Sequence, residues 1–198
     1  MTPPPDAAHA HTREQRRRAL LAGADDADSL DANLFAALIA ARDGGRELAW
    51  LGLSRAQLDA LCARHFPRLP LSAIAAGPIV IAIEDPAHAN FVAALRALLQ
   101  RDVGGTVQRD DAECVASIVA HACLRPDHLW RDLGLRGRDD VTAMLTRYFP
   151  ALVARNVESL RWKKFLAREL ARSLGVPPGP APGCPGCEDY AFCFPPAR

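Results

Sequence analysis

Residues 111–150 have the sequence DAECVASIVAHACLRPDHLWRDLGLRGRDDVTAMLTRYFP, and a related sequence precedes them in residues 31–67, DANLFAALIAARDGGRELAWLGLSRAQLDALCARHFP. The first halves align without gaps at an offset of 80 residues, and both segments end in Phe-Pro. Apolar residues recur at helical spacing, as at Leu34, Leu38 and Ile39. The repeat predicts two related helix–turn–helix units, which we expect to pack on each other as a single all-α bundle.

Local residues mark the ends of the expected helices. Ser54 followed by Gln57 is the pattern of a capping box, and the Phe-Pro pair after it is expected to end that helix. Asp85 and Pro86 are favoured residues for the N-cap and first turn of another helix, which we expect to reach about Gln100.

The chain is expected to have three parts. Residues 1–12 are rich in proline and predict a disordered leader. Residues 13–175 are expected to form the helical domain, which contains both repeat units and ends in a basic helix stopped by Gly175. Residues 176–198 have no counterpart in the repeat and predict an irregular tail rich in Cys, Pro and Gly.

The charge balance excludes two classes of partner. Lys and Arg number 24 against 23 acidic residues, so the chain lacks the basic excess typical of proteins that bind nucleic acid or anionic membranes. The apolar stretch 19–24 follows three arginines but is shorter than the roughly 7–15 residues of a signal-peptide core. We therefore expect a cytoplasmic protein whose six cysteines are core residues or metal ligands.

The tail carries the most specific chemical motif. Cys184, Cys187 and Cys193 have the spacing C-x2-C-x5-C, in which the first two thiolates can face one centre. Neighbouring glycines and prolines favour a stiff, exposed loop with accessible thiolates of low pKa. Thiolates suit zinc, copper(I) and iron–sulfur centres. Zinc would need a fourth protein ligand, whereas three iron corners of a cluster need one thiolate each, which favours a cluster.

Several linked stretches resemble the NifQ family, nitrogen-fixation proteins that supply molybdenum for assembly of the nitrogenase iron–molybdenum cofactor. The similarity covers about residues 110–195. The stretches that carry it are Asp127–Trp130, Asp132–Leu135, Tyr148–Leu152, Ala154–Asn156, Arg161–Leu166 and Ala181–Phe194.

The resemblance implies a molybdenum–iron–sulfur cluster, with molybdate and the nitrogenase cofactor-assembly proteins as partners. The family's cysteine pattern is C-x4-C-x2-C-x5-C, and its first position falls on Gly179 in this chain. Three explanations remain open. Three cysteines suffice with one per iron, another residue replaces the fourth, or this copy has lost cluster binding.

His128 and Cys123 are the candidates for a fourth ligand. The imidazole of His128 can bind molybdenum or iron, although a histidine at this position can equally hydrogen-bond the backbone near a helix cap. Cys123 is the weaker candidate, because small buried cysteines are common in helices. The cysteines and histidine at Cys62, Cys114 and His121 are assigned to the core or surface.

Lys163, Lys164 and Arg168 lie on the basic helix 161–174, just before the tail. These cations are expected either to attract molybdate and offset the charge of a cluster, or simply to form a solvated helix face.

The favoured function is a metallocluster carrier that is not an enzyme, because the sequence has neither a recognisable nucleophile–base pair nor a phosphate-binding loop. Two alternatives remain. One is a helical interaction protein whose tail folds around structural zinc, with His128 or Cys123 closing the site. The other is an iron–sulfur redox or sensor protein without molybdenum.

Overall fold

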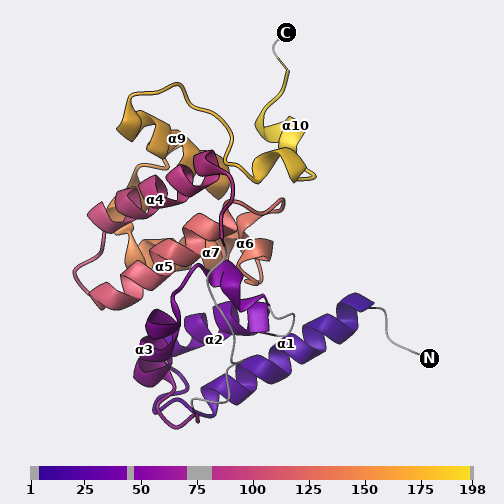
Figure 1. The fold of residues 1–198 in the computed structure, drawn as a ribbon, viewed down its shortest axis with the longest axis vertical. Helices are drawn as coiled ribbons and strands as arrows, with labels where there is room; N and C mark the ends of the chain where they lie inside the picture. Colours follow the sequence, from indigo (N-terminus) through magenta and orange to yellow (C-terminus); the bar gives the residue numbers. More distant parts are fainter. Residues whose placement is uncertain (1–4, 44–46, 71–81, 197–198) are drawn as a thin grey trace. The chain divides into compact units, whose positions relative to one another are not determined.

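The computed structural model describes residues 5–43, 47–70 and 82–196, and every regular element in these ranges is helical (Figure 1). This confirms the predicted all-α class. The chain divides into two compact units, Met1–Ile81 and Ala82–Arg198. No helix within the described ranges is long and apolar enough to cross a membrane.

The first unit contains α1 (Pro5–Leu21), α2 (Leu30–Asp43), the 3-10 turn η1 (Leu48–Leu51) and α3 (Arg55–His65). Helices α1 and α2 pack along each other. Their core is formed by fully buried apolar residues, and the ring of Phe35 lies 4.8 Å from that of His65. The predicted capping box is confirmed, since the Ser54 side chain accepts from the Gln57 N–H and the Gln57 side chain accepts from the Ser54 N–H.

The leader expected over residues 1–12 is wrong from Pro5 onward, where α1 begins. Bonds between side chains one helical turn apart support this helix, including Gln15 to His11 and Arg18 to Glu14 at 2.8 Å each. Such i,i+4 pairs favour helix formation, whereas the prolines on which the expected leader rested stand only at the start of the segment.

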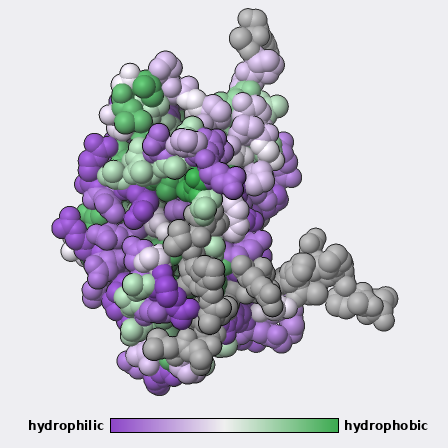
Figure 2. All heavy atoms as spheres, in the orientation of Figure 1, coloured by the Kyte–Doolittle hydropathy of each residue, from purple (hydrophilic) through white to green (hydrophobic). Residues whose placement is uncertain are grey.

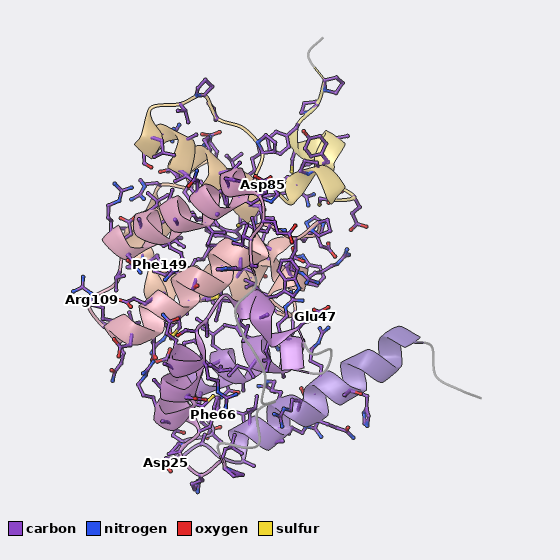
Figure 3. The ribbon with its side chains drawn as sticks, in the orientation of Figure 1. Asp25, Glu47, Phe66, Asp85, Arg109 and Phe149 are labelled. Atoms are coloured by element: carbon purple, nitrogen blue, oxygen red, sulfur yellow. The ribbon has the colours of Figure 1, made fainter. Side chains whose placement is uncertain are left out.

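The second unit contains α4 (Pro86–Arg101), α5 (Arg109–Ala122), α6 (Leu129–Asp132), α7 (Arg138–Tyr148), α8 (Pro150–Ala154) and α9 (Trp162–Leu174). The central helix is α5, which is buried along most of its length and packs against α4. Asp85 caps α4 through its side chain, as predicted (Figure 3). Gly175 ends α9 in the left-handed conformation, with φ of 68°.

The tail is not wholly irregular, in contrast to the prediction. It contains the 3-10 turn η3 (Cys184–Gly186) and the four-residue helix α10 (Tyr190–Cys193). These turns fix the spacing between the three tail cysteines, because Cys187 N donates to Cys184 O at 2.9 Å and Cys193 N donates to Asp189 O at 3.2 Å.

Equivalent positions of the two sequence repeats adopt the same backbone geometry. Gly52 and Gly134 are both left-handed, with φ of 64° and 70°. Phe66 and Phe149 end α3 and α7 with φ of −136° in each case, and both are buried (Figure 3). One copy lies in each unit, so the packing of the copies against each other stays a prediction.

Arg155 joins three helices of the second unit. Its guanidinium lies 2.6 Å from Asp102 at the end of α4 and 2.9 Å from the buried carboxylate of Glu169 on α9. These pairs raise the pKa of Arg155, chiefly through the hydrogen bonds that it donates to Asp102. The network fixes the direction of α9, which carries the basic residues that face the tail.

We predict that Arg155→Met lowers the free energy of unfolding by about 1–3 kcal/mol, because it deprives two poorly exposed carboxylates of a partner. Chemical denaturation monitored by circular dichroism measures this change. Arg136→Met is the matched control, since Arg136 forms a single exposed pair with Asp140 on the next turn. Equal stability of both variants would show that the Arg155 network does not hold the unit together.

Candidate metal centre

A cavity of about 660 Å³ in the second unit brings together residues that are far apart in the sequence. Cys184, Cys187 and Cys193 line it from the tail, and His128 lines it from the segment before α6. The first turn of α9 completes the wall. The three cysteines and the histidine singled out by the sequence therefore share one cavity.

Two glycines seat the cysteine loop on the segment that follows α5. Gly183 N donates to the Cys123 carbonyl at 2.9 Å, and a Cβ on Gly183 would lie 1.9 Å from the carbonyl oxygen of Arg125. A Cβ on Gly186 would lie 2.4 Å from Cβ of Pro126. Only glycine permits both close approaches, so these positions fix where Cys184 and Cys187 lie.

The three tail cysteines are free thiols of unequal burial. Cys184 is buried, whereas Cys187 and Cys193 are partly exposed. Burial raises the pKa of the Cys184 thiol, and the nearby Lys163 ammonium opposes this rise. The expectation of a fully exposed loop with low-pKa thiolates is therefore wrong for Cys184, because the glycines draw it against the body of the unit.

His128 lies at the N-cap of α6 and makes polar contacts on both sides of its ring. Its Nδ1 is 3.3 Å from the Arg161 guanidinium, and its Nε2 is 3.1 Å from Oδ2 of Asp189. Because a guanidinium only donates, Nδ1 is the acceptor and Nε2 carries the proton given to Asp189. Binding a metal through Nε2 would displace that proton and the Asp189 contact.

Asp127, His128 and Glu188 bring one ligand atom each within 4.8 Å of one another. Arg131 lies between the two carboxylates, at 3.2 Å from Asp127 and 2.8 Å from Glu188. The wall of the cavity thus offers nitrogen and oxygen donors beside the thiols, although arginines already bind the carboxylates.

Cys123 is placed differently from His128. Its side chain is fully buried, and burial raises the pKa of its thiol to about 12, so this thiol stays protonated near neutral pH. Its carbonyl group accepts from Gly183. The residue supports the cysteine loop through its backbone.

The basic helix faces the site with cations that are already bound to protein groups. Lys163 is only 6% exposed, and its Nζ donates to the Asp132 carboxylate and to the carbonyls of Arg125 and Asp127. Lys163 is therefore not part of a solvated helix face, and it is not accessible to a molybdate ion arriving from water. Both of these expectations are wrong for this residue. It remains a buried positive charge close to Cys184.

The other two basic candidates, Lys164 and Arg168, lie nearer the surface. Lys164 Nζ donates to the Cys193 carbonyl and lies 5.1 Å from the centre of the Phe194 ring. Arg168 pairs with Glu158 at 2.7 Å.

Sequence reasoning missed Arg161, Glu188 and Asp189 as parts of the site. Arg161 lies 2.6 Å from Asp189. Asp189 stands between Cys187 and Cys193 in the sequence of the tail. Two adjacent acidic residues inside a cysteine motif, after a helix with several cations, were the available signal.

Gly179, where the family pattern has its first cysteine, is exposed, and a Cβ there would meet no atom within 4 Å. Lack of space therefore does not explain the missing cysteine.

The fold and the cavity define a helical protein with a candidate thiolate metal centre. The chain belongs to the NifQ family, whose model matches residues 6–195, which confirms the resemblance seen in the sequence.

Individual relatives agree with this assignment. The chain is similar to Protein NifQ of Rhodobacter capsulatus, with 34% identity over 153 residues that cover 75% of this chain and 77% of that protein. Protein NifQ of Azotobacter vinelandii is 46% identical over 87 residues, and the NifQ homolog of Sinorhizobium fredii is 43% identical over 79. These two matches cover only 45% and 34% of the respective relatives. No solved structure matches the chain significantly.

We predict that Gly183→Ala displaces the cysteine loop from the segment that follows α5, because the new methyl group would overlap the Arg125 backbone. The expected loss is about 1–3 kcal/mol in the free energy of unfolding, together with faster alkylation of the Cys184 thiol. Gly179→Ala is the matched control in the same tail, since its methyl group would meet open space. An unchanged Cys184 alkylation rate in Gly183→Ala would contradict the close packing of Gly183 on the Arg125 backbone.

Proposed function

We propose that this chain is a cytoplasmic carrier of a molybdenum–iron–sulfur cluster that supplies molybdenum for assembly of the nitrogenase iron–molybdenum cofactor. The cluster is its cargo, molybdate is the source of the molybdenum, and the nitrogenase cofactor-assembly proteins are its partners. The observation that supports this proposal most directly is the sharing of one cavity by Cys184, Cys187 and Cys193 with His128.

The donor set suits such a cargo. Three thiols offer one soft ligand to each of three irons, and an imidazole on the cavity wall offers a harder ligand for a fourth metal. Iron–sulfur clusters bound by thiolates carry negative charge, and the buried Lys163 ammonium lies beside Cys184 to offset it. The chain's own donors therefore supply the ligands and part of the charge compensation.

A carrier rather than an enzyme is proposed because the cavity opens to solvent at two of its three thiols. Cys187 and Cys193 are partly exposed, so an acceptor protein can reach ligands of the cargo directly. Accessible cysteines of this kind are also sensitive to oxidation, which would require protection from oxygen during transfer.

A structural zinc site is the second candidate function. The three thiols and His128 also make a Cys3His set, which is a common ligand set of structural zinc. In that case the protein would be a helical interaction module whose tail is stabilised by the metal.

Metal loading separates these functions. After anaerobic incubation with iron, sulfide and molybdate, we expect about three irons and about one molybdenum per chain, and loss of both in Cys187→Ala. Cys62→Ala is the control, because Cys62 is buried in the first unit and does not line this cavity.

Other loading results would support the alternatives. Binding of zinc alone would favour the structural site, and iron with sulfide but without molybdenum would favour a redox or sensor protein. Either result would overturn the carrier proposal.

We further predict that His128→Ala lowers the molybdenum content more than the iron content, because its imidazole is the harder donor beside three thiols. Metal analysis and the absorption spectrum of the loaded variant measure this. His88→Ala is the control, since His88 is a partly exposed histidine on α4 that pairs with Asp85. Unchanged metal content and spectrum in His128→Ala would remove His128 from the ligand set.

A further inference from the structure

The tail is attached to the second unit by two kinds of contact. The segment with Cys184 and Cys187 is attached by close backbone packing, through Gly183 on Arg125 and Gly186 on Pro126. Ala181 and Cys184 are buried in this contact. Water cannot substitute for such packing, so this part of the tail is firmly seated.

The segment with Cys193 lacks such a seat. Helix α10 contains no buried residue, and the side chain of Phe192 is 76% exposed. On the face drawn in Figure 2 the surface is mainly hydrophilic, with apolar side chains in separate groups. The packing around Cys193 therefore contributes little to holding it.

Polar contacts at the surface hold this second segment. Arg161 pairs with Asp189 at 2.6 Å, and its guanidinium also lies 5.0 Å from the centre of the Phe192 ring. Lys164 Nζ donates to the Cys193 carbonyl. Arg161 and Asp189 are each more than a third exposed, and pairs of this kind compete with water and are screened by salt.

We propose that Cys184 and Cys187 are fixed ligands of the cargo and that Cys193 is a releasable ligand, positioned by Arg161 and Lys164. This inference rests on the proposed carrier function. Opening of the α10 segment breaks the contacts of Arg161 and Lys164 and that of His128 with Asp189, while the close packing at Gly183 and Gly186 stays in place. The site then loses one ligand of three.

Release of Cys193 is a ligand exchange without electron transfer. Its Sγ leaves as a thiolate with the electron pair of the metal–sulfur bond and takes up a proton from water. A ligand of the acceptor donates an electron pair in its place. One ligand is lost and one gained, so the metal keeps its coordination number.

Two consecutive lysines on α9 contact the two parts of the site, one beneath the fixed cysteines and the other at the releasable one. Lys163 points into the unit and binds the segment on which the fixed pair is seated, whereas Lys164 binds the backbone of the releasable ligand. Arg172, further along α9, pairs with Glu169 on the same helix rather than with a tail residue, which makes it a matched control.

The first test uses the metal-free chain and measures the alkylation rate of each cysteine by iodoacetamide, resolved by peptide mass spectrometry. In the double variant Arg161→Gln, Lys164→Met we expect the Cys193 rate to rise about tenfold while the Cys184 rate changes less than about twofold. High salt should act on the unmodified chain in the same direction. Arg172→Met should leave all three rates unchanged.

Two outcomes would overturn the inference. Equal acceleration of all three cysteines would mean that the tail opens as one piece, and no acceleration of Cys193 would mean that these cations do not hold it. Circular dichroism distinguishes both from general unfolding.

The second test uses the loaded chain and follows transfer of iron to a chelator. We expect the double variant to release iron about tenfold faster than the Arg172→Met control. Equal release rates would overturn the inference. A chain that takes up no iron would refute the carrier function instead, while the alkylation test still decides whether Cys193 is separately held.

Discussion

The ammonium of Lys163 is buried between the Asp132 carboxylate and two backbone carbonyls, those of Arg125 and Asp127. These contacts tie the segment between α5 and α6 to the first turn of α9. Removing the Asp132 carboxylate would leave the Lys163 ammonium buried without its charged partner, which is strongly unfavourable. Gly183 and Gly186 pack on this same segment, so the position of the cysteine loop depends on a buried ion pair beneath it.

Features that depend on local chemistry could be predicted from the sequence. The capping box at Ser54, the N-cap at Asp85 and the stop at Gly175 each involve residues within a few positions, and all three are present. The partner of Lys163 lies 31 residues away in the sequence. A lysine on a basic helix face is therefore indistinguishable, by periodicity alone, from a solvated one.

The candidate ligands of the site could be predicted from the sequence, whereas the long-range contacts that hold them in place could not. Cysteine spacing identified the three tail thiols, and the structure brings them to one cavity with His128. Burial of Cys184 could not be foreseen, because it follows from the approach of Gly183 to a backbone 58 residues earlier, at Arg125. Cys123 meets the tail through its carbonyl, a contact that its residue type does not reveal, and its role as a ligand stays a prediction.

A carrier must retain its cargo and also surrender it, and uniform ligands would serve only one of these needs. Three equally buried thiols would retain a metal as a structural site does, whereas three equally exposed thiols would lose it to any competing ligand. Here one thiol is buried over a backbone seat, and another lies on an exposed turn held by ion pairs. An acceptor that competes for Arg161 or Lys164 would loosen Cys193 without disturbing the close packing that holds Cys184 and Cys187. Under the proposed function, binding of the correct partner and opening of the site would then be the same event.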